Sequence, residues 1–171
     1  MSVASFARNG NFLGLLLANT ILGSAMPLLI ILGGLAGLML APSTALATVP
    51  ASLQTFAGLL AAGPFSLLMG RFGRKIGFMV GGGFAIGGAL LGTWALVDGN
   101  FVILCLAHLM LGAALASYQY FRFAAAEVVS HDWQPVAISL MLSSGLIAAF
   151  AGPQVFIWAK DALMPVPLAG A

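Results

Sequence analysis

Long apolar stretches, separated by short polar or glycine- and proline-containing breaks, dominate the chain. The apolar stretches cover about residues 12–40, 45–69, 76–97, 100–126 and 135–159. Each reaches the roughly 20 residues that a helix needs to cross the hydrocarbon core of a bilayer. The alternation over ten-residue segments that marks the strands of a membrane barrel is absent. The pattern therefore predicts an all-α membrane protein with five transmembrane helices, the first kinked or tilted around Pro27.

Composition supports the same conclusion. The chain has 171 residues, of which 61% are hydrophobic and only 6% are charged, whereas soluble domains carry about 25% charged residues. So few charges cannot cover a soluble domain. Because the basic residues sit between apolar spans, the net charge of +2 does not point to nucleic acid, and no nucleic-acid partner is expected. Cys105 is the single cysteine, which excludes an intrachain disulfide. The bilayer is the expected environment.

Half of the positive charge is concentrated in one break, GRFGRK at residues 70–75. If the N-terminus is cytoplasmic, only Lys160 lies outside. The basic residues on or near the inner side are then Arg8, Arg71, Arg74, Lys75 and Arg122. Because cytoplasmic segments of membrane proteins are enriched in Lys and Arg, this asymmetry predicts a cytoplasmic N-terminus and an inner loop at 70–75.

The segment SLLMGRFGRK at residues 66–75 resembles a signature of the major facilitator superfamily, Gly-x-x-x-Asp-Arg-x-Gly-Arg-Arg/Lys, which falls in this same loop. Ser66 replaces the leading glycine, and Gly70 replaces the aspartate that helps to latch the two halves of the family's transporters. The resemblance implies a cytoplasmic gate element without that aspartate. Its candidate residues are Gly70, Arg71, Gly73, Arg74 and Lys75.

Two further segments are similar to family patterns. LAHLMLG at residues 106–112 resembles Arg-x-x-Gln-Gly, with His108 where arginine is usual, and Gly152-Pro153 resembles the motif of the fifth helix. Family members have twelve helices in two six-helix halves, each an inverted pair of three-helix repeats. The resemblance implies that residues 1–171 are an incomplete six-helix N-terminal half in a bacterial cytoplasmic membrane. Its partner is then the missing C-terminal half or a second protomer; a complete five-helix protein is the alternative.

The fourth apolar stretch carries polar and small residues on one face of a helix, in a stripe roughly 100° wide. They are Cys105, His108, Gly112, Gln119 and Arg122. An arginine facing lipid costs about 2.5–3.5 kcal/mol, so the stripe is expected to face the bundle interior or a water-filled cavity. In the superfamily the first and fourth helices line the central path, which makes Asn19, with Gly23 and Met26, the expected opposite wall.

The candidates for the substrate path are therefore Asn19, His108, Gln119 and Arg122. Simpler roles stay open: Asn19 as an interhelical hydrogen bond and Arg122 as a side chain that reaches the inner surface. Cys105 and His108 lie one turn apart and are weak candidates for Cu(I), since a copper-importing branch of the superfamily exists.

No phosphate loop, paired carboxylates or HExxH motif is present, and the consecutive Ser130, His131 and Asp132 do not form a triad. We therefore expect no enzyme and no cofactor. Secondary transport of a small molecule or ion by alternating access is the favoured function. A non-transporting membrane scaffold or assembly factor is the alternative. The sequence does not identify the solute, the coupling ion or the direction of transport.

Overall fold

The computed structural model describes residues 9–160, 162–163, 166 and 168. In this part of the chain the elements are helices and no strand is present. In chain order they are α2 (Gly10–Leu40), the 3-10 turn η1 (Thr44–Leu46), α3 (Val49–Phe72), α4 (Arg74–Asp98), α5 (Phe101–Tyr118), α6 (Phe121–Glu127), the 3-10 turn η2 (His131–Trp133) and α7 (Gln134–Ala159).

Within the described residues, five segments are long and apolar enough to cross a membrane. Two of them are single helices, α2 and α4, and the other three are η1 with α3, α5 with α6, and η2 with α7. The prediction of an all-α protein with five transmembrane helices is confirmed. Arg8, one of the basic residues expected inside, lies outside the described residues.

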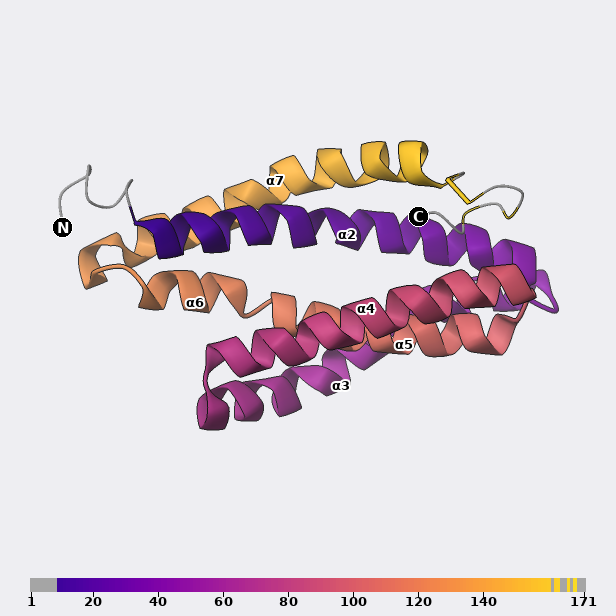
Figure 1. The fold of residues 1–171 in the computed structure, drawn as a ribbon, viewed down its shortest axis with the longest axis horizontal. Helices are drawn as coiled ribbons and strands as arrows, with labels where there is room; N and C mark the ends of the chain where they lie inside the picture. The colour runs from indigo at the N-terminus through magenta and orange to yellow at the C-terminus, as the bar shows by residue number, and fades with distance from the viewer. Residues whose placement is uncertain (1–8, 161, 164–165, 167, 169–171) are drawn as a thin grey trace.

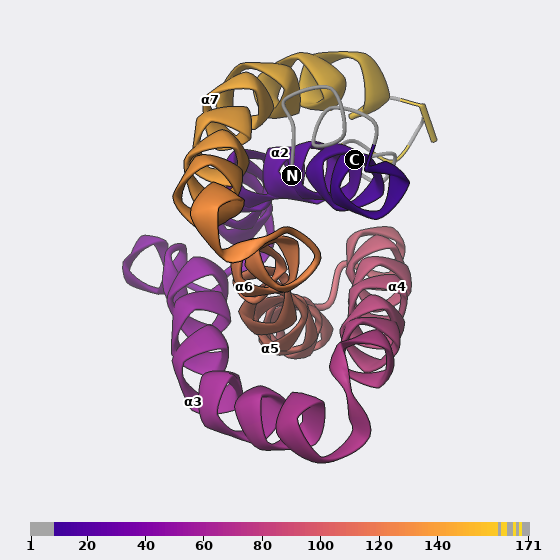
Figure 2. The ribbon, with the colours of Figure 1, turned by 90° about the vertical axis from the view of Figure 1, so that its left-hand side faces the viewer.

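The helices form two groups (Figures 1 and 2). α2 and α7 run side by side, while α5 lies between α3 and α4, and α6 continues toward the end of the molecule where α7 begins. The start of α2, the α3–α4 turn and the α6–α7 connection lie at one end of the molecule, and the α2–α3 and α4–α5 connections lie at the other. This alternation is what successive membrane crossings require.

Close approach between helices depends on glycines that face backbone. A Cβ added to Gly112 of α5 would overlap the carbonyl oxygen of Gln54 on α3, and one added to Gly152 of α7 would overlap that of Ser24 on α2. Without a hydrophobic effect between helices in lipid, such tight van der Waals packing is a main source of association. The predicted motif Gly152-Pro153 therefore lies at the α2–α7 contact, with Gly152 buried and Pro153 inside α7.

The segment 70–75 differs from the expected loop. Gly70 and Arg71 belong to the last turn of α3, Arg74 and Lys75 begin α4, and Gly73 alone separates the two helices. Gly73 has φ +86° and ψ 160°, a conformation that side chains disfavour. The basic residues are thus held on helix ends rather than on a flexible loop.

The fourth span is broken, whereas the apolar pattern predicted one helix over 100–126. Asn100 caps its start by accepting hydrogen bonds from Val102 N and Ile103 N. The regular helix ends at Tyr118, and α6 begins at Phe121 after a turn in which Tyr120 N donates to Ser117 O at 3.1 Å. The Tyr120 hydroxyl donates to Ala62 O of α3 at 2.8 Å, which anchors the break against a neighbouring helix.

Candidate functional site: a polar cavity between α2, α7 and the broken span

A cavity of about 420 Å³ lies where α2, α7 and the junction of α5 and α6 meet. α2 contributes Asn19, Gly23 and Met26, and the broken span contributes Tyr118, Gln119 and Arg122. This volume is in the range of small-molecule sites, about 300–1,000 Å³. The cavity therefore brings Asn19, Gly23 and Met26 together with Gln119 and Arg122 of the predicted stripe.

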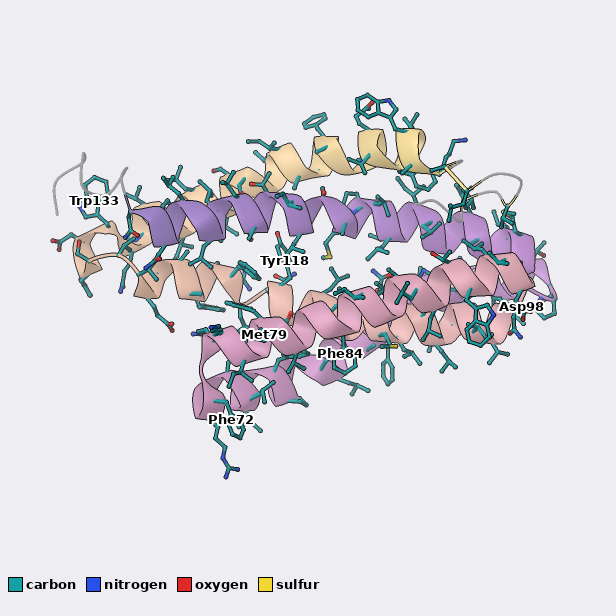
Figure 3. The ribbon with its side chains drawn as sticks, viewed as in Figure 1. Phe72, Met79, Phe84, Asp98, Tyr118 and Trp133 are labelled. Atoms are coloured by element: carbon teal, nitrogen blue, oxygen red, sulfur yellow. The ribbon has the colours of Figure 1, made fainter. Side chains whose placement is uncertain are left out.

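The break after Tyr118 determines how the fourth span meets this cavity. Gln119 N still donates to Leu115 O at 3.3 Å, so Gln119 stays at the end of α5 while its side chain is exposed. The Tyr118 hydroxyl lies against Gly23, where an added Cβ would stand 2.7 Å from the oxygen. In Figure 3 the Tyr118 side chain lies between α2 and the lower helices. Polar groups therefore line the cavity on both sides of the break.

Arg122 provides the positive charge of the cavity. It is partly buried, and its Nε has no hydrogen-bond partner. Its Cζ lies 5.2 Å from the centroid of the Phe123 ring, a cation–π distance. Since a buried donor without an acceptor is costly, this guanidinium is suited to a ligand that brings a carbonyl or anionic oxygen.

Asn19 has a structural role that the simpler interpretation anticipated. It is buried, and its Nδ2 donates to Met141 O at 2.9 Å and to Ser144 Oγ at 2.7 Å, both on α7. These bonds join α2 to α7 and occupy both hydrogens of the amide. Asn19 lines the cavity, but its amide nitrogen already donates both of its hydrogens to α7.

α7 forms the third wall, which the sequence reasoning did not predict. Met141 and Gly145 line the cavity. The buried residues of this helix recur every three or four positions: Ala137, Met141, Ser144, Ala148, Gly152 and Phe156. This stripe of mostly small residues is the signal in the sequence that α7 lies closely against another helix.

The predicted stripe of the fourth span divides into two parts. His108 does not line the polar cavity; it is 1% exposed and borders a separate cavity of about 180 Å³ with residues of α2 and α4. Gly112 is buried against α3. The physical reason is separation along the helix axis: at 1.5 Å per residue, His108 lies about 16 Å from Gln119, so the two side chains meet different neighbours although they share a face of α5.

The basic residues around Gly73 differ in their contacts. Arg74 forms a two-pronged ion pair with Glu127 at the end of α6, with Nη2–Oε1 at 2.5 Å and Nε–Oε2 at 3.2 Å. Its Cζ also lies 5.9 Å from the centroid of the Tyr120 ring. Arg71 and Lys75 are exposed. The sequence pattern did not indicate Glu127 as the partner of Arg74.

The structure adds no further candidate ligand to Cys105 and His108 for a copper ion. Across the described residues there is no group of three or more His, Cys, Asp or Glu side chains that could hold a metal ion. The hydrogen bond between His108 Nδ1 and Leu104 O, at 2.9 Å, occupies one of the two ring nitrogens. Cys105 and His108 therefore stay a pair of neighbours on α5.

The fold defines a polytopic helical membrane protein with a cavity of small-molecule size between its helices. The chain is 34% identical over 170 residues to the riboflavin transporter RfnT of Brucella anthropi. The aligned region covers 99% of this chain and 42% of that protein. It is 32% identical over 111 residues to the uncharacterized MFS-type transporter YddS of Bacillus subtilis, and this aligned region covers 64% of this chain and 25% of that protein. No family model and no solved structure matches the chain.

With the five membrane-length helices and the signature around Gly73, these relatives show that the chain belongs to the major facilitator superfamily. It spans about two fifths of the length of RfnT, consistent with the N-terminal portion of such a transporter. The relatives are named as transporters and not as enzymes.

Proposed function

We propose that the chain forms part of a secondary active transporter that moves a small solute across the cytoplasmic membrane of a bacterium by alternating access. The cavity between α2, α7 and the α5–α6 junction is the proposed solute site. The observation that carries this proposal is Arg122, a charged side chain without a partner for Nε, set in a cavity of small-molecule size. The transporter relatives support the same function.

The proposed solute is a planar heterocycle with carbonyl acceptors, of which riboflavin is the first to test because RfnT is named a riboflavin transporter. Arg122 and Gln119 supply hydrogen-bond donors, while Tyr118, Met26 and Met141 supply an aromatic and two thioether surfaces around them. Such sites commonly combine apolar walls with a few polar groups that fix orientation.

In the proposed orientation the N-terminus and Gly73 lie in the cytoplasm, as the positive-inside bias favours. The gate element then comprises Gly70, Arg71, Gly73, Arg74 and Lys75. Its support in the structure is the ion pair between Arg74 and Glu127, which ties the start of α4 to the end of α6. Reporter tags at residue 1 and near Gly73 should both report the cytoplasmic side.

Uptake of labelled riboflavin by a riboflavin-requiring bacterium that expresses the complete reading frame encoding this chain tests the function. Gln119→Leu should reduce uptake several-fold, because the cavity loses a hydrogen-bonding group. Gln154→Leu is the matched control, since Gln154 is an exposed glutamine of α7 that does not line the cavity. Membrane insertion with no uptake of riboflavin would reject this solute. No uptake of any tested small solute would favour the scaffold role instead.

A further inference from the structure

Tyr118, the last residue of α5, borders two different cavities. One is the cavity of about 420 Å³ that is proposed above as the solute site. The other is a cavity of about 300 Å³ between α2, α4 and α5, lined mostly by glycines and apolar side chains such as Gly82, Ala25 and Leu115. Within the described residues, no other residue lines both of these cavities. The Tyr118 side chain therefore stands at the boundary between the solute cavity and an apolar cavity.

Gly23 of α2 leaves the space that the end of the Tyr118 side chain occupies. A Cβ added to Gly23 would stand 2.7 Å from the Tyr118 hydroxyl oxygen and 3.1 Å from Ala148 Cβ of α7. Nonbonded carbon atoms pack best at about 3.5–4.0 Å, so a larger residue at this position would displace the hydroxyl. Figure 3 shows the Tyr118 side chain between α2 and the lower helices. The glycine therefore determines how far the ring reaches toward α2.

The Tyr118 hydroxyl is a polar group that is free to bind a ligand. Among the described residues it makes no hydrogen bond, and its ring lies 6.0 Å from the ring of Phe121. A phenolic hydroxyl both donates and accepts hydrogen bonds. Its oxygen lies next to Gly23, which lines the same cavity as Arg122. The solute cavity thus offers this hydroxyl in addition to the Nε of Arg122 that has no partner.

We propose that Tyr118 is a specificity-determining residue of the solute site and that Gly23 is its positioning residue. The Tyr118 ring closes the solute cavity toward the apolar cavity, and its hydroxyl forms a hydrogen bond with a heteroatom of the solute. This inference rests on the proposed function, because it takes the cavity as the place where the solute binds. It adds a limit to that function: the bound ring system ends at Tyr118 and presents a polar atom there.

The contact between the hydroxyl and Gly23 makes the two positions energetically dependent on each other. Gly23→Ala displaces the hydroxyl, whereas Tyr118→Phe removes it. Substitutions at residues in contact are expected to be non-additive. Any effect of the new Cβ on Ala148 should persist in the Tyr118→Phe background, while the effect that passes through the hydroxyl should disappear. The double variant therefore separates positioning of Tyr118 from packing of α2 against α7.

Uptake of labelled riboflavin by the complete protein tests the assignment of the two residues. Gly23→Ala should raise the apparent KM about 10-fold with little change in the maximal rate, because binding is altered and later steps are not. Tyr118→Phe should raise it about 3-fold, as expected for one hydrogen bond. The double variant should resemble Tyr118→Phe alone. Gly14→Ala, on the same helix but with nothing within 4 Å of the added Cβ, should leave the KM unchanged.

Thiol labelling tests the boundary between the two cavities without any solute. In the complete protein with Cys105→Ala, a membrane-impermeant thiol reagent should not label Leu115→Cys, because Leu115 lines the apolar cavity and not the solute cavity. With Tyr118→Ala added, the same cysteine should react, since the solute cavity then opens into the apolar one. Leu104→Cys, at a position that is 1% exposed, should react in neither background.

Additive effects of Gly23→Ala and Tyr118→Phe on the KM would overturn the inference, since Gly23 would then act through helix packing. Labelling of Leu115→Cys with Tyr118 in place, or its absence after Tyr118→Ala, would overturn the boundary role. If Tyr118→Ala does not fold, as judged by thermal melting, Tyr118→Leu must give the labelling in its place. No riboflavin uptake by the wild-type protein would reject the proposed solute together with this inference. Normal wild-type uptake with any of the contrary results would reject this inference alone.

Discussion

α5 and α6 belong to one membrane span, yet their surroundings differ. α5 packs against α3 and α4 through close contacts at Gly112 and Ser117, the latter against Gly81. α6 packs against α7 and the start of α2, and its Phe121 ring also stacks on Phe78 of α4 at a centroid distance of 4.3 Å. α5 is closely packed between neighbouring helices, whereas α6 carries the charged residues Arg122 and Glu127.

Position along the span separates structural from proposed functional residues. His108 and Gln119 share a face of the same helix, but they lie about 16 Å apart along its axis, and the structure places His108 in the packed region and Gln119 at the cavity. Polarity alone therefore does not identify cavity residues. Their position along the helix axis does.

The largest effect on stability should come from Gly112→Ala in the packed part. The new Cβ would overlap the carbonyl oxygen of Gln54, and because this neighbour is backbone, the two helices must separate. We expect a loss of about 3 kcal/mol in the free energy of unfolding, at the upper end of overpacking costs. Thermal unfolding in detergent measures the change.

Gly83→Ala on α4 is the control for this substitution, because a Cβ there meets nothing within 4 Å. It should leave stability within about 1 kcal/mol of wild type. Equal destabilisation by both substitutions would contradict the close α3–α5 contact.

The next largest effect is expected at the turn between α3 and α4. Gly73 has φ +86°, and a side chain in this region of conformational space costs about 1–3 kcal/mol. Gly73→Leu should therefore destabilise the turn by about 2 kcal/mol, displace Arg74 from Glu127 and impair transport while membrane insertion is retained. Gly70→Leu, inside α3 with open space around the site, should have little effect on stability. A silent Gly73→Leu would mean that the segment serves only as an orientation signal.

The sequence was sufficient for the parts that depend on hydrophobic length. Five apolar stretches predicted the five spans because a bilayer requires about 20 apolar residues for each crossing. The expectation that Asn19 lies opposite Gln119 and Arg122 came from the family resemblance, and the three residues line one cavity. The break at Tyr120 could not be predicted, since it depends on the hydrogen bond to Ala62 O in another helix. For the same reason Glu127 was missed, because its partner Arg74 is far away in the sequence.

A smaller effect should follow from Asn19→Ala in the cavity wall. The hydrogen bonds to Met141 O and Ser144 Oγ would be lost, and interhelical bonds of this kind in membranes are worth about 0.6–1.7 kcal/mol. We expect a loss of about 1 kcal/mol in unfolding free energy. Asn11→Ala, at an exposed position on the same helix, should change it by less than about 0.5 kcal/mol. Equal losses of unfolding free energy in the two variants would show that the hydrogen bonds of Asn19 do not stabilise the contact between α2 and α7.

The smallest effect is expected for the ion pair of α6. The side chains of Arg74 and Glu127 are 31% and 56% exposed, and exposed pairs contribute about 0.2–1 kcal/mol. A double-mutant cycle with Arg74→Gln and Glu127→Gln should give a coupling energy of about 0.5 kcal/mol, which decreases with added salt. The same cycle with Lys75→Gln in place of Arg74→Gln should show no coupling. Coupling at Lys75 as large as at Arg74 would contradict the specific pairing.

Thiol labelling on either side of the break tests most directly whether the cavity between α2, α7 and the α5–α6 junction is the solute path. In the complete protein with Cys105→Ala, a membrane-impermeant thiol reagent should label Gln119→Cys and Gly145→Cys, and riboflavin should protect both. Ser117→Cys, only two residues from Gln119 but 5% exposed, should not react. Labelling of Ser117→Cys as fast as Gln119→Cys, or no labelling at Gln119 and Gly145, would contradict a water-accessible path at this site.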